Sequence, residues 1–347
     1  MQLARLWDPW QISEGSLPNR GTQSEKLRFI LNYAVLAPSS HNSQPWLFKI
    51  NENGVDLYAD RTRALPVTDP DDRELIVSCG AALFHLRLAL QHFGYVIRVE
   101  SLSDSTNQDL LARVIVDTKN DYRASRVDNL LFNAMTKRRT NRMPFENRKI
   151  PDTLLQELQA SASKEGTWLN FALGEDNRNQ VADLISEGDR IQMANRHFRR
   201  ELAAWVHPNR AVSHDGMPGY ALGISGFASS FASIVVRTFD IGKGQAAKDR
   251  QLASGSPVLG LLGTDGDSLS DWLSTGQALA RVLLRARRDG VWASFLNQPV
   301  EVPELRPRLR DLFGRKGFPQ MLMRMGYGQD VRPTPRRTPG EVLVRGR

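Results

Sequence analysis

Residues 37–46 read APSSHNSQPW and separate two stretches of opposite character. Upstream, apolar residues recur every three or four positions between 27 and 35, which predicts a helix capped by Ser24 and ended by Pro38. Downstream, residues 46–50 read as a buried strand that follows a proline directly. The polar side chains of the stretch are therefore expected on a connection that core elements hold at both ends.

Hydroxyl and amide side chains dominate this connection, which contains no Asp, Glu, Lys or Arg. A rigid loop of this composition suits hydrogen bonding to a planar polar ligand. A turn whose side chains satisfy its own backbone is the alternative, and the residues alone leave both interpretations open. The positions are Ser39, Ser40, Asn42, Ser43 and Gln44.

The composition is that of an ordinary globular protein, with 347 residues of which 41% are hydrophobic, enough for two domains or one large one. The N-terminal stretch has acidic residues and no continuous apolar run, so we expect no signal peptide. No apolar run approaches the roughly 18 residues of a spanning helix, so no membrane partner is expected. Cys79 is the single cysteine, which excludes an internal disulfide and is consistent with a cytoplasmic location.

The net charge of +8 could indicate nucleic acid, but the arginines are spread over many segments and are not interleaved with aromatic residues. We therefore expect no nucleic-acid partner, and a small anionic ligand accounts better for local arginine clusters. His207, His214 and Asp215 do not have the spacing of a metal site, so no metal is expected.

The elements after the connection form a regular series. Residues 46–50 and 55–60 predict a hairpin, and residues 75–93 predict a helix that is apolar nearly all round. Gly94 follows this helix as a C-terminal cap would, and residues 95–100 and 112–117 predict two further strands.

A repeat relates the two ends of the chain. Residues 78–94 align without a gap on residues 274–290, and six of the 17 positions are identical. Trp168-Leu169 likewise opens a predicted strand after a helix, as Trp46-Leu47 does. We interpret the chain as two related halves joined near residue 125.

The halves, 1–125 and 126–347, differ in their accessory segments. The second lacks the polar connection and begins instead with a basic opening, Lys137 to Arg142, while a further basic pair lies at Arg336 and Arg337. Residues 175–250 have no counterpart in the first half, and a lid over a site and an extra packing layer are both possible interpretations. Within this insert, Gly242-x-Gly244-x-x-Ala247 follows an apolar stretch that we read as a strand. It is a weak dinucleotide signal, because a proline follows too soon for a long crossover helix.

The basic segments have the chemistry of an oxyanion site. Arginine guanidinium groups bind oxyanions with two parallel hydrogen bonds, and the hydroxyl of Thr140 adds a neutral donor. A solvated basic turn is the alternative for residues 138–142, and a frayed tail is the alternative for Arg336 and Arg337.

These motifs resemble those of the nitroreductase family. Its flavin-contacting loop reads small residue, Pro, Ser, an Asn three places on, then Gln-Pro-Trp, and its opening reads Arg-Arg-Ser-x-Arg-x-Phe. The chain looks closest to the twin, Acg-type branch. This resemblance implies an α+β nitroreductase-like fold, in which two fused halves form an intramolecular pseudo-dimer that acts as a monomer and binds one FMN between the halves.

The resemblance also implies an activity and a set of contacts. Hydride would pass from NAD(P)H to FMN and on to a nitroaromatic or quinone acceptor, with no side chain in a catalytic role. A protein that stores FMN without turnover is the alternative, if the insert covers the face that a nicotinamide must approach. The implied cofactor-binding residues are Pro38, Ser39, Ser40, Asn42, Gln44, Arg138, Arg139, Thr140, Arg142, Ser294, Leu296, Asn297, Arg336 and Arg337.

Overall fold

The computed structural model describes residues 8–101, 107–224, 226 and 228–344. Residues 1–7, which begin the N-terminal stretch for which we expect no signal peptide, lie outside the described residues. Positions 225 and 227 of the insert lie outside them as well.

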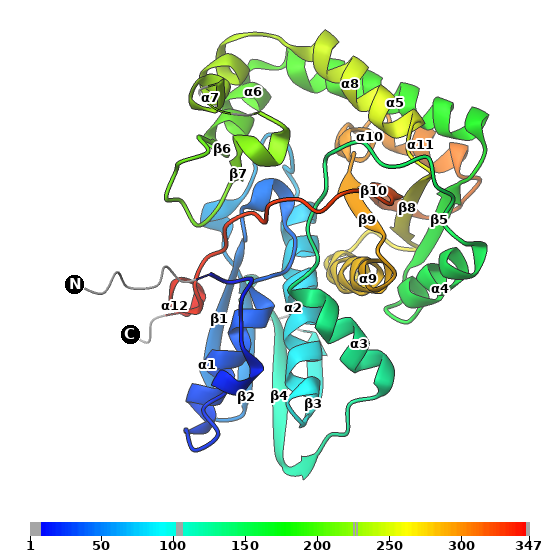
Figure 1. Ribbon diagram of the computed structural model, residues 1–347. Coiled ribbons are helices and arrows are strands. Elements are labelled where there is room, and N and C mark those ends of the chain that lie inside the picture. The colour runs from blue at the N-terminus through cyan, green and yellow to red at the C-terminus, as the bar shows by residue number, and fades with distance from the viewer. Residues whose placement is uncertain (1–7, 102–106, 225, 227, 345–347) are drawn as a thin grey trace.

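The first half is a four-stranded antiparallel sheet of order β1-β2-β4-β3 with helices packed against it (Figure 1). The hairpin, the long helix and the two further strands expected from the sequence are all present. The elements are η1 (Glu14–Ser16), α1 (Gln23–Ala34), η2 (Ser40–Asn42), β1 (Trp46–Asn51), β2 (Gly54–Ala59), η3 (Arg61–Arg63), α2 (Arg73–His92), β3 (Tyr95–Ser101) and β4 (Leu110–Asp121).

The second half has a sheet of the same design, antiparallel and of order β5-β8-β10-β9. In both halves a long helix connects the second strand to the third. The elements are α3 (Arg126–Met135), α4 (Asp152–Ser163), β5 (Trp168–Ala172), β8 (Val258–Thr264), α9 (Leu269–Arg288), β9 (Trp292–Phe295), α10 (Gln298–Glu301), α11 (Arg306–Leu312), β10 (Phe318–Gly326) and α12 (Pro339–Val342). The α+β fold class with two fused halves, expected from the sequence, is confirmed.

The halves meet where α2 crosses α9 (Figure 1). Gly80 and Gly276, which coincide in the sequence repeat, lie at this crossing. A Cβ on Gly80 would come within 2.2 Å of the Leu273 carbonyl oxygen, and one on Gly276 within 2.0 Å of the Val77 carbonyl oxygen. Only glycine permits the two backbones to approach this closely.

The insert packs on the second half. It contains α5 (Glu175–Ala194), α6 (Arg196–Ala204), β6 (Val206–His207), β7 (Met217–Pro218), η4 (Gly219–Leu222), α7 (Ala228–Thr238) and α8 (Gly242–Ser254). Side chains of α5 and α8 such as Ile185 and Ala253 join one face of the second sheet, whereas α4 and α9 cover the other face. In Figure 1, α5 to α8 form a layer across the top of the molecule.

The C-terminal segment returns from the second half to the first (Figure 1). After β10 it runs to α12, where Leu343 forms a parallel bridge with Phe48 of β1 and the backbone N–H of Val344 donates to the Phe48 carbonyl. This return brings the basic pair of the C-terminal segment beside the polar connection of the first half.

Three local expectations differ from the structure. The cap of α1 is Thr22, which forms a reciprocal capping box with Glu25, so Ser24 lies inside the helix. The helix itself ends at Ala34, and turns lead from there to Pro38. The apolar stretch before Gly242 is the helix α7 and not a strand, so the glycines that follow do not close a strand–turn–helix unit.

Helix α2 is long and apolar enough to cross a membrane by length and composition, contrary to our expectation that no segment would be. In the protein, 83% of its apolar window is buried, which is the environment of a core helix.

Candidate functional site

The polar connection has a strained backbone. His41, Asn42 and Gln44 all adopt positive φ angles, of 52°, 56° and 53°, a region that costs a residue with a Cβ about 1 kcal/mol or more. The pKa of His41 is lowered to about 4 by burial and by the nearby Arg142, so its ring is neutral near pH 7. Strain of this kind persists only where surrounding contacts hold the loop.

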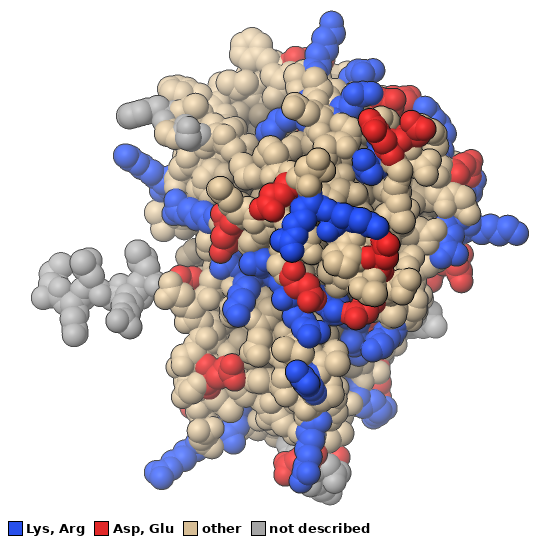
Figure 2. All heavy atoms as spheres, turned by 45° about the vertical axis from the view of Figure 1, so that its right-hand side comes forward, with Lys and Arg blue, Asp and Glu red and all other residues tan. Residues whose placement is uncertain are grey.

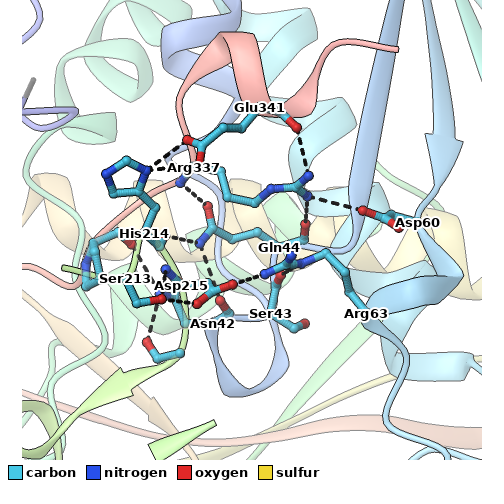
Figure 3. A network of polar contacts seen from close by, with 12 residues as sticks. Asn42, Ser43, Gln44, Asp60, Arg63, Ser213, His214, Asp215, Arg337 and Glu341 are labelled. Carbon is cyan, nitrogen blue, oxygen red and sulfur yellow. Dashed lines mark hydrogen bonds and ion pairs between the residues drawn. The ribbon is translucent and has the colours of Figure 1, made fainter. Parts of the chain in front are cut away.

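Gln44 supplies one set of these contacts (Figure 3). Its side-chain oxygen accepts from the backbone N–H of Arg337 at 2.8 Å, and its amide donates to the His214 carbonyl at 2.8 Å. The Arg337 guanidinium donates in turn to the Gln44 carbonyl at 2.9 Å and lies 3.4 Å from Asp60. The connection is thereby tied to the C-terminal segment and to the insert.

Asn42 supplies the other set. Its amide donates to the carbonyls of Gly216 and Pro335 at 2.9 and 3.1 Å, and its oxygen accepts from Arg336 Nη1 at 2.8 Å. Both side-chain atoms of Asn42 therefore have partners within the protein. That Asn42, Gln44 and Arg337 contact a cofactor directly stays a prediction; what the structure shows is that they hold the loop in place.

A cavity of about 330 Å³, which we call the central cavity, lies beside the connection. Its size is that of a small-molecule site. The insert contributes wall residues from α5, α6 and α8, such as Met193, Phe198 and Leu252. Seven of the site residues expected from the sequence line this cavity: Pro38, Ser39, Ser40, Arg142, Ser294, Leu296 and Asn297.

The basic opening reaches the cavity by pairing with β9. Thr140 forms a parallel bridge with Ala293, and the backbone N–H of Asn141 donates to the Ala293 carbonyl at 3.0 Å. This alignment places Arg142 in the cavity wall, where burial lowers the pKa of its guanidinium. Residues 138–142 are thus a fixed segment beside β9 and not a solvated turn.

Three further arginines, Arg138, Arg139 and Arg336, lie close enough to act on one another's charges, and we call them the arginine cluster. The guanidinium carbons of Arg139 and Arg336 lie over the Trp10 ring, 4.5 and 4.8 Å from its centroid. Arg138 is only 3% exposed and donates at 3.0 Å to the carbonyl of Leu36, the residue before the polar connection. The cluster therefore contacts the chain just before the polar connection through Arg138, and the connection itself at Asn42 through Arg336.

Within the described part of the chain, no carboxylate forms an ion pair with any member of the arginine cluster, and the Nε atoms of all three have no hydrogen-bond partner. Asp8 and Asp330 act on Arg139 only from beyond ion-pair distance. Burial and the neighbouring Arg139 lower the pKa of Arg138 to about 9, and burial with repulsion from Arg138 and Arg139 lowers that of Arg336 well below its ordinary value. A bound anion with more than one negative charge stabilises buried cations of this kind most strongly.

Sequence reasoning missed Glu74, at the start of α2. It accepts a hydrogen bond from the Ser40 hydroxyl and another from the Asn297 amide at 3.0 Å. Glu74 thus links the polar connection to the segment after β9. These are two segments that were expected from the sequence to form the cofactor site. Nothing in the local pattern marked Glu74, since acidic residues are common in the first turn of a helix.

A carboxylate pair in the insert was also missed. Asp189 of α5 and Asp249 of α8 both accept from the Gln298 amide, at 3.0 and 3.1 Å, and all three line the cavity. The second oxygen of Asp189 has no partner among the described residues. Burial and the neighbouring Asp249 raise the pKa of Asp189 to about 8.

Arg324 in β10 is the third missed group. It is 1% exposed and donates to the carbonyls of Asn141 and Met143, while its Nε and Nη1 have no partner in the described chain. Burial and the nearby Arg142 lower its pKa to about 10. A lone arginine inside the apolar strand sequence MLMRMG was the signal that could have identified it.

No group of three or more His, Cys, Asp or Glu side chains with metal-binding geometry occurs among the residues that the structure describes.

Comparisons with known proteins give related chains but no matching family model. The Mycobacterium tuberculosis protein Rv3131, provisionally named an NAD(P)H nitroreductase, is 30% identical over 326 residues, which cover 92% of this chain and 91% of that one. The protein Acg of the same organism, provisionally named in the same way, is 27% identical over 93% of this chain and 95% of its own. Among solved structures, the FMN-dependent nitroreductase NfnB from Mycobacterium smegmatis in complex with NADPH matches 63% of this chain and 99% of its own, with 14% identity and a TM-score of 0.40.

Proposed function

The chain belongs to the NAD(P)H nitroreductase family, and from this premise we propose that it binds one FMN noncovalently and transfers hydride from NAD(P)H to a small electron-poor acceptor. Nitroaromatic and quinone compounds are the acceptor classes that we propose. The observation that carries the proposal is the position of residues 37–46, which line the central cavity on one side and touch the arginine cluster on the other.

The residues present fit the two ends of FMN. Ser39, Ser40 and Asn297 place hydroxyl and amide groups in the wall of the central cavity, where Glu74 holds Ser40 and Asn297 in position for a planar polar ring. Arg138 and Arg336 each keep an unpartnered Nε–H that a phosphate dianion could accept from, while their Nη atoms donate to the protein. When bound, the flavin would accept and donate the hydride, so the chain's own task is to hold the ring, neutralise the phosphate and limit access of water.

We also propose that residues 1–125 and 126–347 descend from one ancestral unit and form a monomeric pseudo-dimer with a single site. The shared strand order of the two sheets and the glycine contact at the α2–α9 crossing support this. A monomer mass in sedimentation velocity is the expected result. In the cell, we propose a cytoplasmic location, which fractionation with a cytoplasmic marker tests.

A second candidate function is storage of FMN without turnover. The observation that favours it is the contribution of α5, α6 and α8 to the cavity wall, because this layer covers one side of the site. If the layer stays closed, a nicotinamide cannot stack on the ring and hydride transfer cannot occur.

The test begins with an absorbance scan of the purified protein for flavin bands. We then expect NADH or NADPH to bleach the bands anaerobically, and a nitroaromatic or quinone to restore them with multiple turnovers. Bands that persist with both nucleotides would favour storage. A protein that binds no flavin when FMN is added would contradict both functions.

A further inference from the structure

Helix α7 in the insert exposes an apolar face. Phe231, Ile234 and Val235 of α7 are 60%, 57% and 41% exposed, and Phe239, which directly follows the helix, is 60% exposed. The helical spacing puts the first three on one side of α7, and the opposite side carries the buried Ser229. Large apolar side chains scattered singly on a surface are ordinary, but three on one helical face and a fourth just after it indicate an interaction site. We call these four residues the α7 face.

Basic residues lie on the elements next to the α7 face in the sequence. Helices α6, α7 and α8 and the turn between β6 and β7 carry exposed arginines and lysines that form no ion pair with a described residue. These are Arg196, Arg200, Arg210, Arg237 and Lys243.

Fewer acidic residues lie in the same part of the chain, and two of them accept hydrogen bonds from neutral donors. Glu201 accepts from the Thr68 hydroxyl, and Asp240 accepts from the backbone N–H of Gly242. On the face shown in Figure 2, Lys and Arg side chains project from the upper end of the molecule, and acidic side chains lie near some of them.

We propose that the α7 face docks on a membrane surface that contains anionic lipids. A helix that lies in the interface buries its apolar side among the headgroups, and lysines and arginines beside it are attracted to anionic lipids. No spanning segment is needed. The sequence-based expectation of no membrane partner rested on the lack of a spanning segment, so it did not address docking of this kind.

A second copy of this chain is the less suitable occupant. In a two-fold contact through the α7 face, each copy would bring Arg237 and Lys243 against the same basic residues of the other. Like charges placed opposite each other disfavour such a contact, whereas an anionic lipid surface neutralises them.

Docking has a consequence for the acceptor, which rests on the proposed function. Val236 of α7 lines the central cavity, so the helix that would touch the bilayer also forms part of the cavity wall. Quinones that dissolve in the bilayer are then the acceptor class that reaches the cavity most readily.

Co-sedimentation of the full chain with lipid vesicles tests the docking. We expect binding to vesicles of equal parts phosphatidylcholine and phosphatidylglycerol, weaker binding to phosphatidylcholine alone, and weakening by salt. Phe231→Ser/Phe239→Ser should lower the partition coefficient at least about tenfold, because two large apolar side chains no longer enter the interface. Arg237→Gln/Lys243→Gln should lower it about tenfold for the anionic vesicles.

Val127→Ser is the matched control, because Val127 is 48% exposed on α3, away from the insert. It should bind as the unmodified chain does, and unchanged thermal melting of all variants shows that they are folded. Failure of the unmodified chain to bind anionic vesicles, or an equal loss in the control, would overturn the proposal. So would a dimer in sedimentation velocity that the double Phe variant abolishes, because the face would then bind a second copy.

A quinone assay separates this inference from the proposed function. With a short-chain, water-soluble quinone, the double Phe variant should match the unmodified chain. With a long-chain quinone embedded in anionic vesicles, it should be about tenfold slower, in proportion to its lost binding. Equal rates on the embedded quinone would overturn the docking consequence alone, whereas no reduction of either quinone would overturn the proposed function and leave vesicle binding to be judged separately.

Discussion

The two sheets share one strand order but have different surroundings. The first sheet is covered by helices on one face and presents charged residues such as Lys49 and Arg113 on the other, whereas the second is covered on both faces. Their loops also differ: the turn before β5 is four residues, KEGT, while the corresponding connection before β1 holds three strained polar residues. Equal topology therefore fixes only the shared core, and the chemistry of the site lies in the segments that the halves do not share.

The α2–α9 crossing tests the shared core and should give the largest effect. Gly80→Ala puts a Cβ within 2.2 Å of a backbone oxygen, so we expect the free energy of unfolding to fall by about 3 kcal/mol. Chemical denaturation measures this. The control is Gly244→Ala in α8, where nothing lies within 4 Å of the new Cβ, and it should stabilise by about 0.5–1 kcal/mol. Equal effects of the two substitutions would mean that the halves do not depend on this contact.

The arginine cluster tests the segments that the halves do not share. Arg138→Ala removes a buried guanidinium from the proposed phosphate site, so we expect FMN binding to weaken by about 1.5–3 kcal/mol. Titration of the apoprotein with FMN measures it. Arg126→Ala on the exposed side of α3 is the control and should bind FMN normally. If Arg138→Ala bound FMN with unchanged affinity, the proposal that Arg138 contacts the phosphate would be wrong.

The strained connection should give a smaller effect on stability. Asn42→Ala removes hydrogen bonds to the insert and to the C-terminal segment, and we expect a loss of about 1–2 kcal/mol together with a shifted flavin spectrum. Asn53→Ala in the exposed β1–β2 turn is the control. A normal spectrum with reduced stability would leave Asn42 a purely structural role.

The carboxylate pair gives the smallest effect, seen as a pH dependence. The pKa of Asp189 is raised to about 8, so the folded state holds a proton that the unfolded state releases from about pH 4 upward. Its contribution to stability is therefore present below pH 4 and lost as pH rises to about 8. Asp189→Asn should remove that decline and be more stable than the unmodified chain at pH 8. Chemical denaturation between pH 4 and 8 measures this change in the free energy of unfolding. Asp183→Asn, on the exposed side of α5, is the control. If the two variants had the same dependence of stability on pH, the raised pKa would not belong to Asp189.

Much of the fold followed from local patterns. The hairpin of β1 and β2, the apolar helix α2 and its end at Gly94 were expected because each depends on neighbouring residues. Helix α7 was not, because its apolar residues were read as a strand. Their spacing is helical, but the apolar side is the exposed one, which contradicts the usual relation between pattern and burial.

The site was expected only in part. The cavity positions of Ser39, Ser40 and Asn297 agree with the resemblance, but Glu74, which joins them, was not expected. Asp189 is paired with a residue sixty positions away, and no local pattern reveals such a pair.

The amino-acid sequence by itself determined the periodicities, the polar connection and the repeat, since these can be read from the order of residue types along the chain. The tertiary structure alone decided which polar groups remain unpartnered, such as the Nε atoms of Arg138 and Arg336, and which apolar face remains exposed. The physical reason is that burial and hydrogen bonding depend on what distant segments bring into contact, and here the returning C-terminal segment and the insert bring the decisive neighbours.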